Sequence, residues 1–136
     1  MSIDVKNGNG FYFVNVYFED KKEEDFEEID DSGRYGPAGT FRLSKETGKV
    51  DQIYTEHTGR QRFLFYFFIM IVGKKLDRPH LATLDPGFTH FLQWKCKVYN
   101  HGPSETPNRV NMKDIDLEKI TCFSEKDIDD IKIVMN

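Results

Sequence analysis

The alternation of apolar and polar residues predicts a strand near the start of the chain. Residues 11–18 are almost all aromatic or β-branched, and glycines precede them while acidic residues follow. This composition is typical of a strand with one side packed on a core. Its even-numbered positions form one apolar face: Tyr12, Val14, Val16 and Phe18.

A β-hairpin is predicted next. Residues 41–44 and 50–55 have strand-like composition and flank a short turn that ends at Gly48. Glycine suits the left-handed position that a short hairpin loop requires. Val50 and Ile53 would fall on opposite faces of an ideal strand, so we expect a β-bulge near Gly48.

The longest apolar run, residues 63–72, predicts a buried helix. Thr58 and Gln61 have the spacing of a capping box at its start, and Gly73 followed by two lysines is typical of a helix end. A buried strand would also explain the run, but these end signals favour a helix over 59–73. Because such a helix is apolar all round, it must be covered on nearly every side.

The last third of the chain predicts two strands and a short helix. Residues 91–99 alternate well and residues 116–123 are strand-like. Ser124 and Asp127 have the spacing of a capping box that begins a C-terminal helix. An alternative is that this helix ends early and that residues 131–135 form a β-branched tail.

Prolines and glycines mark the segments 32–39, 77–90 and 100–110 as connections. A chain of 136 residues can bury one hydrophobic core without a disulfide or a metal ion. We therefore expect a single α+β domain over residues 1–136. In it an antiparallel sheet of about five strands packs on one buried helix, with a short C-terminal helix.

The charge of the chain is strongly segregated. Residues 19–31 contain nine acidic residues and two lysines, a net charge of −7 in a chain whose total is −4. Residues 32–113 carry +7 and residues 114–130 carry −5. Burying an unpaired carboxylate costs on the order of several kcal/mol, so both acidic segments must lie at the surface. They either fold over the basic middle and neutralise it or face a basic partner.

No catalytic or metal-binding pattern is present in the sequence. His80, Asp85 and His90 are close along the chain, but no His-x-x-x-His pair or His–Cys cluster supports a metal site. Cys96 and Cys122 lack the setting of an activated nucleophile and are expected to be buried free thiols. We therefore expect a protein that is not an enzyme and that binds no metal and no cofactor.

Two further features bear on localisation and partners. The N-terminal residues lack the pattern of a signal peptide, and the longest apolar run has about half of the ~20 residues that span a bilayer. These features predict a cytoplasmic protein without membrane contact.

Lys95 and Lys97 would share a strand face with Phe91 and Tyr99. Proteins that bind single-stranded nucleic acids use such a stripe of basic and aromatic side chains. The isoelectric point of about 5.6 opposes phosphate binding, so we expect no direct nucleic-acid partner.

This profile is that of a single acidic domain with 14% aromatic residues, no signal peptide and no catalytic constellation. It resembles the small cytoplasmic immunity proteins that protect bacteria from toxins of contact-dependent inhibition and other polymorphic toxin systems. The resemblance covers the whole chain as a profile, without a diagnostic motif. It implies a cognate toxin, often a nuclease, whose basic active site an acidic surface would cover.

The acidic segment supplies both attraction and anchors for such a partner. Carboxylates speed the encounter with a basic protein, and buried apolar side chains hold it. The predicted partner-binding residues are Glu23, Glu24, Asp25, Phe26, Glu27, Glu28, Ile29, Asp30, Asp31 and Tyr35.

The alternative function is that of a cone-shaped α+β domain of the nuclear-transport-factor-like or cystatin-like kind, which binds a small ligand or acts as an enzyme. There a curved sheet wraps a helix and leaves an aromatic pocket. Its candidate lining residues are Phe11, Tyr17, Phe65, Phe68 and Trp94. The simpler interpretation is that these side chains fill the core.

Overall fold

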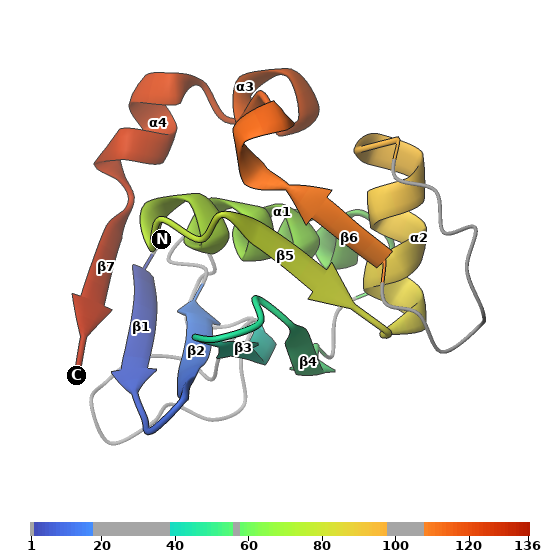
Figure 1. The fold of residues 1–136 in the computed structure, drawn as a ribbon. Helices are drawn as coiled ribbons and strands as arrows, with labels where there is room; N and C mark the ends of the chain where they lie inside the picture. The colour runs from blue at the N-terminus through green and yellow to red at the C-terminus, as the bar shows by residue number, and fades with distance from the viewer. Residues whose placement is uncertain (1, 18–38, 56–57, 98–107) are drawn as a thin grey trace.

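The computed structural model describes residues 2–17, 39–55, 58–97 and 108–136. Within these ranges strands and short helices surround one long helix (Figure 1). In chain order the elements are β1 (Ser2–Asn7), β2 (Phe11–Tyr17), β3 (Gly39–Ser44), β4 (Val50–Tyr54), α1 (Gly59–Lys75), β5 (His80–Thr83), α2 (Pro86–Lys95), β6 (Asn108–Asn111), the 3-10 helix η2 (Met112–Asp114), α3 (Leu117–Ile120), α4 (Glu125–Asp130) and β7 (Lys132–Met135).

Five strands form one sheet in the order β4-β3-β2-β1-β7. The predicted α+β class and five-stranded sheet are confirmed. The sheet is mixed rather than wholly antiparallel, because β7 lies parallel to β1 while the other neighbours are antiparallel. The predicted strand at 11–18 is β2, in which Val14 and Val16 are buried and Phe13 is exposed. No local pattern encodes the pairing of β1 with β7, since the two strands come from opposite ends of the chain.

The predicted hairpin is formed by β3 and β4, and Gly48 in its turn has a φ of +72°. The predicted bulge lies elsewhere. The register shifts between Thr40 and Arg42, opposite the part of β4 in which Gln52 takes a φ of +49°. Between these pairs β4 has one residue more than β3. The additional residue shifts the alternation of side chains, so that Ile53 packs against the same core that buries Val50.

Helix α1 confirms the predicted helix. Thr58 is its N-cap, as expected, although the Thr58 side chain makes no cap hydrogen bond. Gly73 does not end the helix but lies within it, where a Cβ atom would come within 2.8 Å of Leu81. Glycine is needed there for close packing. The left-handed residue after the helix is Asp77, with a φ of +54°.

The apolar helix α1 is covered on most sides, as its composition requires. Six of its side chains are at most 1% exposed: Phe65, Phe68, Ile69, Met70, Ile71 and Val72. The ring of Phe65 contacts Phe41 of β3, and the ring of Phe68 contacts Phe123 beyond α3. Tyr66 packs on Phe91 of α2. Figure 1 shows α1 running between the large sheet and the layer that α3 and α4 form.

The predicted strand at 91–99 is wrong, because residues 86–95 form helix α2. Asp85 caps the helix by accepting a hydrogen bond from the backbone N–H of Phe88 at 2.9 Å, and Pro86 occupies its first turn. The buried positions follow helical spacing: Phe88, Phe91 and Leu92. A short apolar run fits both the helical and the strand period, and an Asp-Pro pair is a signal for the start of a helix as well as for a turn.

The predicted strand at 116–123 is also wrong, because Asp116 caps the short helix α3 by accepting a backbone N–H at 3.1 Å. The predicted capping box does begin α4: Ser124 and Asp127 exchange two hydrogen bonds of 3.1 Å. The helix ends early, at Asp130, and the following residues join the sheet as β7. The alternative interpretation of this segment is therefore the one that holds.

Segments 77–90 and 100–110, predicted as connections, contain β5 and the start of β6. Strand β5 docks on the turn between β3 and β4, where the backbone N–H of Ala82 donates to the carbonyl of Gly48 at 3.0 Å. A Cβ atom at position 48 would lie 2.4 Å from the carbonyl oxygen of His80. Only glycine permits this approach of the two backbones.

An ion pair joins the two strands of the hairpin. Arg42 donates from Nε to Oδ1 of Asp51 at 2.8 Å and from Nη2 to Oδ2 at 2.7 Å. Hydrogen bonds from a guanidinium favour the ionised carboxyl. They lower the pKa of Asp51 below its ordinary value.

This ion pair predicts a specific loss of stability in acid. Because folding lowers the pKa of Asp51, the pair stabilises the folded protein above the unfolded pKa of about 3.9, and this stabilisation is lost as the pH falls through the folded value. We expect Asp51→Asn to reduce the free energy of unfolding by about 1 kcal/mol at pH 7, since the pair is partly exposed. Urea unfolding of both proteins measures this difference, which should shrink between pH 5 and pH 2. A difference that stays constant would contradict the prediction.

Candidate functional site

The predicted partner-binding residues lie outside the part of the chain that the structure describes. They are Glu23, Glu24, Asp25, Phe26, Glu27, Glu28, Ile29, Asp30, Asp31 and Tyr35. The strands on either side of them are described. β2 ends at Tyr17, β3 begins at Gly39, and Val16 pairs with Gly39. The acidic segment is therefore attached to the sheet at the end where these residues lie.

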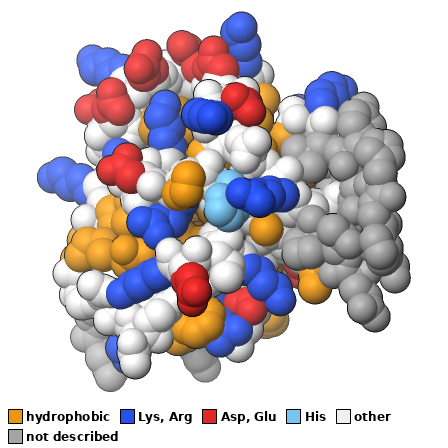
Figure 2. All heavy atoms as spheres, in the orientation of Figure 1, with side chains coloured by type: hydrophobic (Ala, Val, Ile, Leu, Met, Phe, Trp, Pro, Cys, Tyr) orange, Lys and Arg blue, Asp and Glu red, His pale blue; other side chains and the backbone are white. Residues whose placement is uncertain are grey.

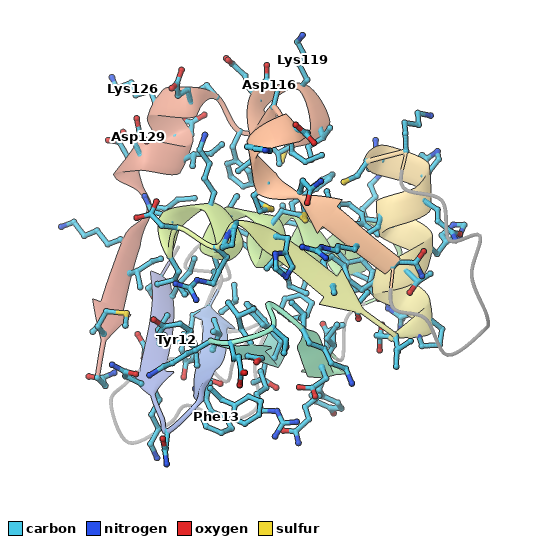
Figure 3. The ribbon with its side chains drawn as sticks, in the orientation of Figure 1. Tyr12, Phe13, Asp116, Lys119, Lys126 and Asp129 are labelled. Carbon is cyan, nitrogen blue, oxygen red and sulfur yellow. The ribbon has the colours of Figure 1, made fainter. Side chains whose placement is uncertain are left out.

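The second acidic segment of the sequence is described and forms an exposed surface on α3, α4 and their flanks. We term it the C-terminal acidic surface; it comprises Asp114, Asp116, Glu118, Glu125, Asp127, Asp129 and Asp130, all of which are exposed. Figure 2 shows acidic side chains gathered over this part of the molecule, with lysines among them. In Figure 3, Asp116 and Lys119 extend outward from α3, and Asp129 and Lys126 from α4.

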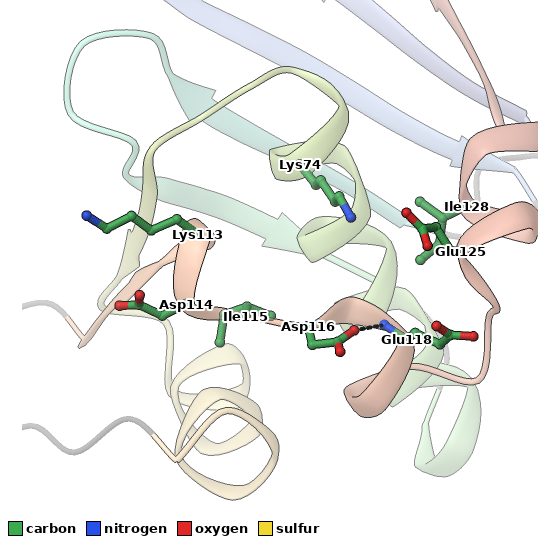
Figure 4. A pocket seen from close by; sticks show the side chains of 8 residues that line it. All are labelled: Lys74, Lys113, Asp114, Ile115, Asp116, Glu118, Glu125 and Ile128. Atoms are coloured by element: carbon green, nitrogen blue, oxygen red, sulfur yellow. Dashed lines mark hydrogen bonds between the residues drawn. The ribbon is translucent and has the colours of Figure 1, made fainter.

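A cavity of about 410 Å³ lies within this surface (Figure 4). Its lining residues come from α1, η2, α3, α4 and the connection between η2 and α3: Lys74, Lys113, Asp114, Ile115, Asp116, Glu118, Glu125 and Ile128. Figure 4 shows the side chains of Lys74 and Glu125 pointing toward one another across it. We term it the acidic cavity, because four carboxylates meet two lysines in its wall. The acidic residues can be identified from the sequence, but the cavity cannot. Its wall includes α3, and the sequence pattern there predicts a strand.

Two of the seven carboxylates of the C-terminal acidic surface have structural roles as helix caps. Asp116 caps α3, and Asp127 completes the capping box of α4. Hydrogen bonds from the backbone N–H and the hydroxyl of Ser124 lower the pKa of Asp127. Five carboxylates remain whose exposure makes them available to a partner: Asp114, Glu118, Glu125, Asp129 and Asp130.

The described part of the chain does not neutralise this surface with ion pairs. Between described residues, Arg42 and Asp51 form the only pair within 4.0 Å. Lys75 does reach α4, but its Nζ donates to the carbonyl of Ile128 at 2.7 Å and to that of Asp129 at 3.3 Å. The lysine thus binds the backbone at the end of α4 and leaves the carboxylates exposed.

The register of the sheet brings the attachment points of the two acidic segments together. Ser2 pairs with Tyr17 on one side and with Lys132 on the other. Tyr17 is the last residue of β2 before the acidic segment at 19–31, and Lys132 begins β7 one residue after the end of α4, with Ile131 between them. Strands are spaced about 4.8 Å apart, so the two attachment points lie about 10 Å from one another.

The residues considered for metal or nucleophilic chemistry do not form a site. His80 contacts Thr47 and Arg109, Asp85 caps α2 and His90 lies within α2. Within the described ranges no group of three or more His, Cys, Asp and Glu side chains is placed to hold a metal ion. Both thiols are free, as predicted, but neither is fully buried: Cys96 is partly buried and Cys122 is exposed. Burial raises the pKa of Cys96 to about 11, which keeps this thiol protonated at neutral pH.

The residues predicted to line the aromatic pocket of the alternative interpretation differ in burial, and Phe11 and Tyr17 are partly exposed on β2. Phe65 and Phe68 are fully buried in the core, whereas Trp94 is 51% exposed on α2. The basic and aromatic stripe predicted on a strand at 91–99 does not form, because residues 86–95 are helical, and Tyr99 lies outside the described residues. Phe91 is buried inside α2, and Lys95 instead lies 4.2 Å from the ring centre of Trp94.

Comparisons with known proteins give no further assignment. No family model, no curated protein and no solved structure matches the chain. In the part of the chain that the structure describes, no helix has the length and apolar character needed to cross a membrane.

Proposed function

We propose that this chain is an inhibitory binding protein that neutralises a basic protein partner, in the manner of bacterial immunity proteins. The observation that carries the proposal is that the strand ends to which the two acidic segments are attached lie close together in the sheet. β2 precedes the segment 19–31, which carries −7, and β7 follows the segment 114–130, which carries −5. Ser2 of β1 pairs with the last residue of β2 and with the first residue of β7. Two acidic regions attached at one end of the sheet favour a single acidic face.

An acidic face of this kind suits a nuclease toxin as partner. The active site of a nuclease is basic because it binds phosphate, and carboxylates that occupy it exclude the substrate. Complementary charge raises association rates by orders of magnitude and selects cationic partners. Apolar anchors are also needed, and the sequence supplies Phe26, Ile29 and Tyr35 beside the carboxylates.

The experiment that tests this function is co-expression with a candidate basic toxin domain, for which the product of the gene that adjoins its own is the first to be tried. We expect cells that produce the domain alone to stop growing and cells that also produce this chain to grow. The two purified proteins should form a complex whose affinity falls as the salt concentration rises from about 20 mM to about 150 mM, because exposed charges are screened within about 8 Å at the higher value. Growth arrest that this chain does not relieve would contradict the proposal.

A further inference from the structure

A second cavity, of about 480 Å³, has the opposite charge. We term it the basic cavity; its lining includes Lys74, Arg78, His80, Arg109, Met112 and Lys113. Lys74 and Lys113 also line the acidic cavity, so the two cavities adjoin. Asp77 is the acidic residue among its described lining residues, which gives this wall a net charge of +3. Figure 2 shows basic side chains and a histidine side by side over β5 and β6.

The guanidinium of Arg78 is held in place by backbone carbonyls. Its Nε donates to the carbonyl of Leu76 at 3.2 Å, and its Nη1 donates to the carbonyl of Lys45 at 2.9 Å. These bonds use two of the five N–H donors of the group. Because neither acceptor is a carboxylate, the charge of Arg78 is positioned without being neutralised.

His80 fixes a second guanidinium in the same wall. Its Nε2 lies 2.7 Å from the carbonyl oxygen of Thr47, and its Nδ1 lies 3.1 Å from Nη2 of Arg109. A carbonyl only accepts and a guanidinium only donates, so both contacts are satisfied when the ring carries its proton on Nε2 and accepts at Nδ1. The turn between β3 and β4 therefore positions Arg78 and Arg109 together, through Lys45 and Thr47.

The positive charge of the cavity is also unpaired within the described structure. None of its four lysine and arginine residues forms an ion pair within 4.0 Å of a described carboxylate. Desolvating and ordering charged groups opposes binding, and groups that are already fixed by the fold reduce this cost. An anion entering the cavity would meet two oriented guanidinium groups.

We infer that the basic cavity binds a small phosphate monoester of about the size of a mononucleotide. Guanidinium forks match the oxygens of a phosphate in pairs, and a dianion complements the charge of the wall. Met112 and Pro79 provide an apolar surface for the remainder of the ligand. The volume lies in the range of about 300–1,000 Å³ that small-molecule sites occupy.

The adjoining acidic cavity restricts the ligand to a small molecule. A polyanion such as RNA would extend beyond the basic cavity and run over Asp114, Glu118 and the other carboxylates of the C-terminal acidic surface. Repulsion from these groups and from the negative charge of the whole chain opposes such binding. A single phosphate group meets only the basic wall.

The proposal is tested by titrating the full chain with adenosine 5′-monophosphate at about 50 mM salt and following the reaction by calorimetry and by NMR. We expect saturable binding of the monophosphate that shifts the signals of His80 and Met112. Adenosine, which lacks the phosphate, should not bind detectably. Inorganic phosphate should bind at least about tenfold more weakly, because it lacks the apolar body.

Matched variants identify the site. The double variant Arg109→Gln and Lys113→Gln removes two charges from the cavity wall and should weaken binding at least about tenfold. The control variant Lys119→Gln and Lys126→Gln removes the same charge from exposed positions on α3 and α4, labelled in Figure 3, and should change binding less than about twofold. Urea unfolding curves verify that both variants fold.

Three outcomes would overturn the inference. The monophosphate and adenosine could bind equally or not at all, which would exclude a phosphate site. Both double variants could weaken binding equally, which would show an effect of net charge alone. A single-stranded oligonucleotide could bind more tightly than the monophosphate and compete with it, which would make the cavity part of a polyanion surface.

Discussion

Reversal of five carboxylates to lysine, at Glu23, Glu24, Asp25, Glu27 and Glu28, is expected to abolish protection against the toxin. The change converts the segment that the proposal places on the partner from strongly negative to positive. Like charges brought together across an interface cost several kcal/mol, so the affinity should fall at least about a thousandfold. Surface plasmon resonance measures this loss, which should lie largely in the association rate at low salt.

A matched reversal separates local contact from total charge. The control reverses the five carboxylates of the C-terminal acidic surface that do not cap a helix: Asp114, Glu118, Glu125, Asp129 and Asp130. Both variants change the net charge of the chain equally. We expect the control to weaken binding by far less, about tenfold, because it alters the long-range field and the edge of the acidic face but not the anchors.

Equal binding by the wild-type protein and the N-terminal reversal variant would contradict the proposed function. Equal loss in both variants would show that total charge alone drives the association. Circular dichroism and urea unfolding test whether each variant keeps its fold, which we expect because the described carboxylates lie at the surface. Growth rescue in the co-expression experiment should follow the measured affinities.

Replacing Gly48 with alanine is expected to destabilise the protein by about 3–4 kcal/mol. A left-handed φ of +72° costs an alanine about 1–2 kcal/mol, and its Cβ would lie 2.4 Å from the carbonyl oxygen of His80. That contact is with backbone, so the turn must move away from β5. The movement breaks the hydrogen bond from Ala82 to Gly48 and the one between His80 and Thr47, each contributing about 1 kcal/mol.

Gly10 provides the matched control for this substitution. Its φ is +81°, but a Cβ atom built on it has no neighbour within 4 Å. Alanine at position 10 should therefore cost only the left-handed strain, about 1–2 kcal/mol. Denaturant unfolding of both variants measures the difference. Equal losses at the two positions would show that the docking of the turn on β5 contributes nothing to stability.

The sequence predicted elements correctly where one period dominated and the ends were marked. The run at 63–72 with its flanking signals became α1, and the alternation at 11–18 became β2. It failed at α2, because residues 91–99 alternate like a strand, whereas the helical spacing of Phe88, Phe91 and Leu92 crosses the start of that run. Short apolar runs carry both periods, and the cap formed by Asp85 was the feature that distinguished them.

The same distinction applies to the two candidate sites: the acidic residues follow from local composition, whereas the basic cavity depends on segments that are distant in the sequence. Segregated charge was visible in the sequence, and it led to the acidic residues that the proposed function uses. The basic cavity was not visible, because it assembles residues from α1, β5, β6, η2 and the connection between α1 and β5. Arg78 and Arg109 are distant in the sequence, and the turn at Lys45 and Thr47 that positions them is distant from both.

The sequence alone determined the α+β class, the buried central helix, the hairpin and the uneven distribution of charge, since each follows from local composition and period. The tertiary structure decided which distant segments meet. It placed β7 beside β1, so that both acidic segments attach at one end of the sheet. It also brought the turn at Gly48 against β5, so that two guanidinium groups share a wall. Contacts of this kind depend on packing between elements, and the pattern of a single segment does not contain that information.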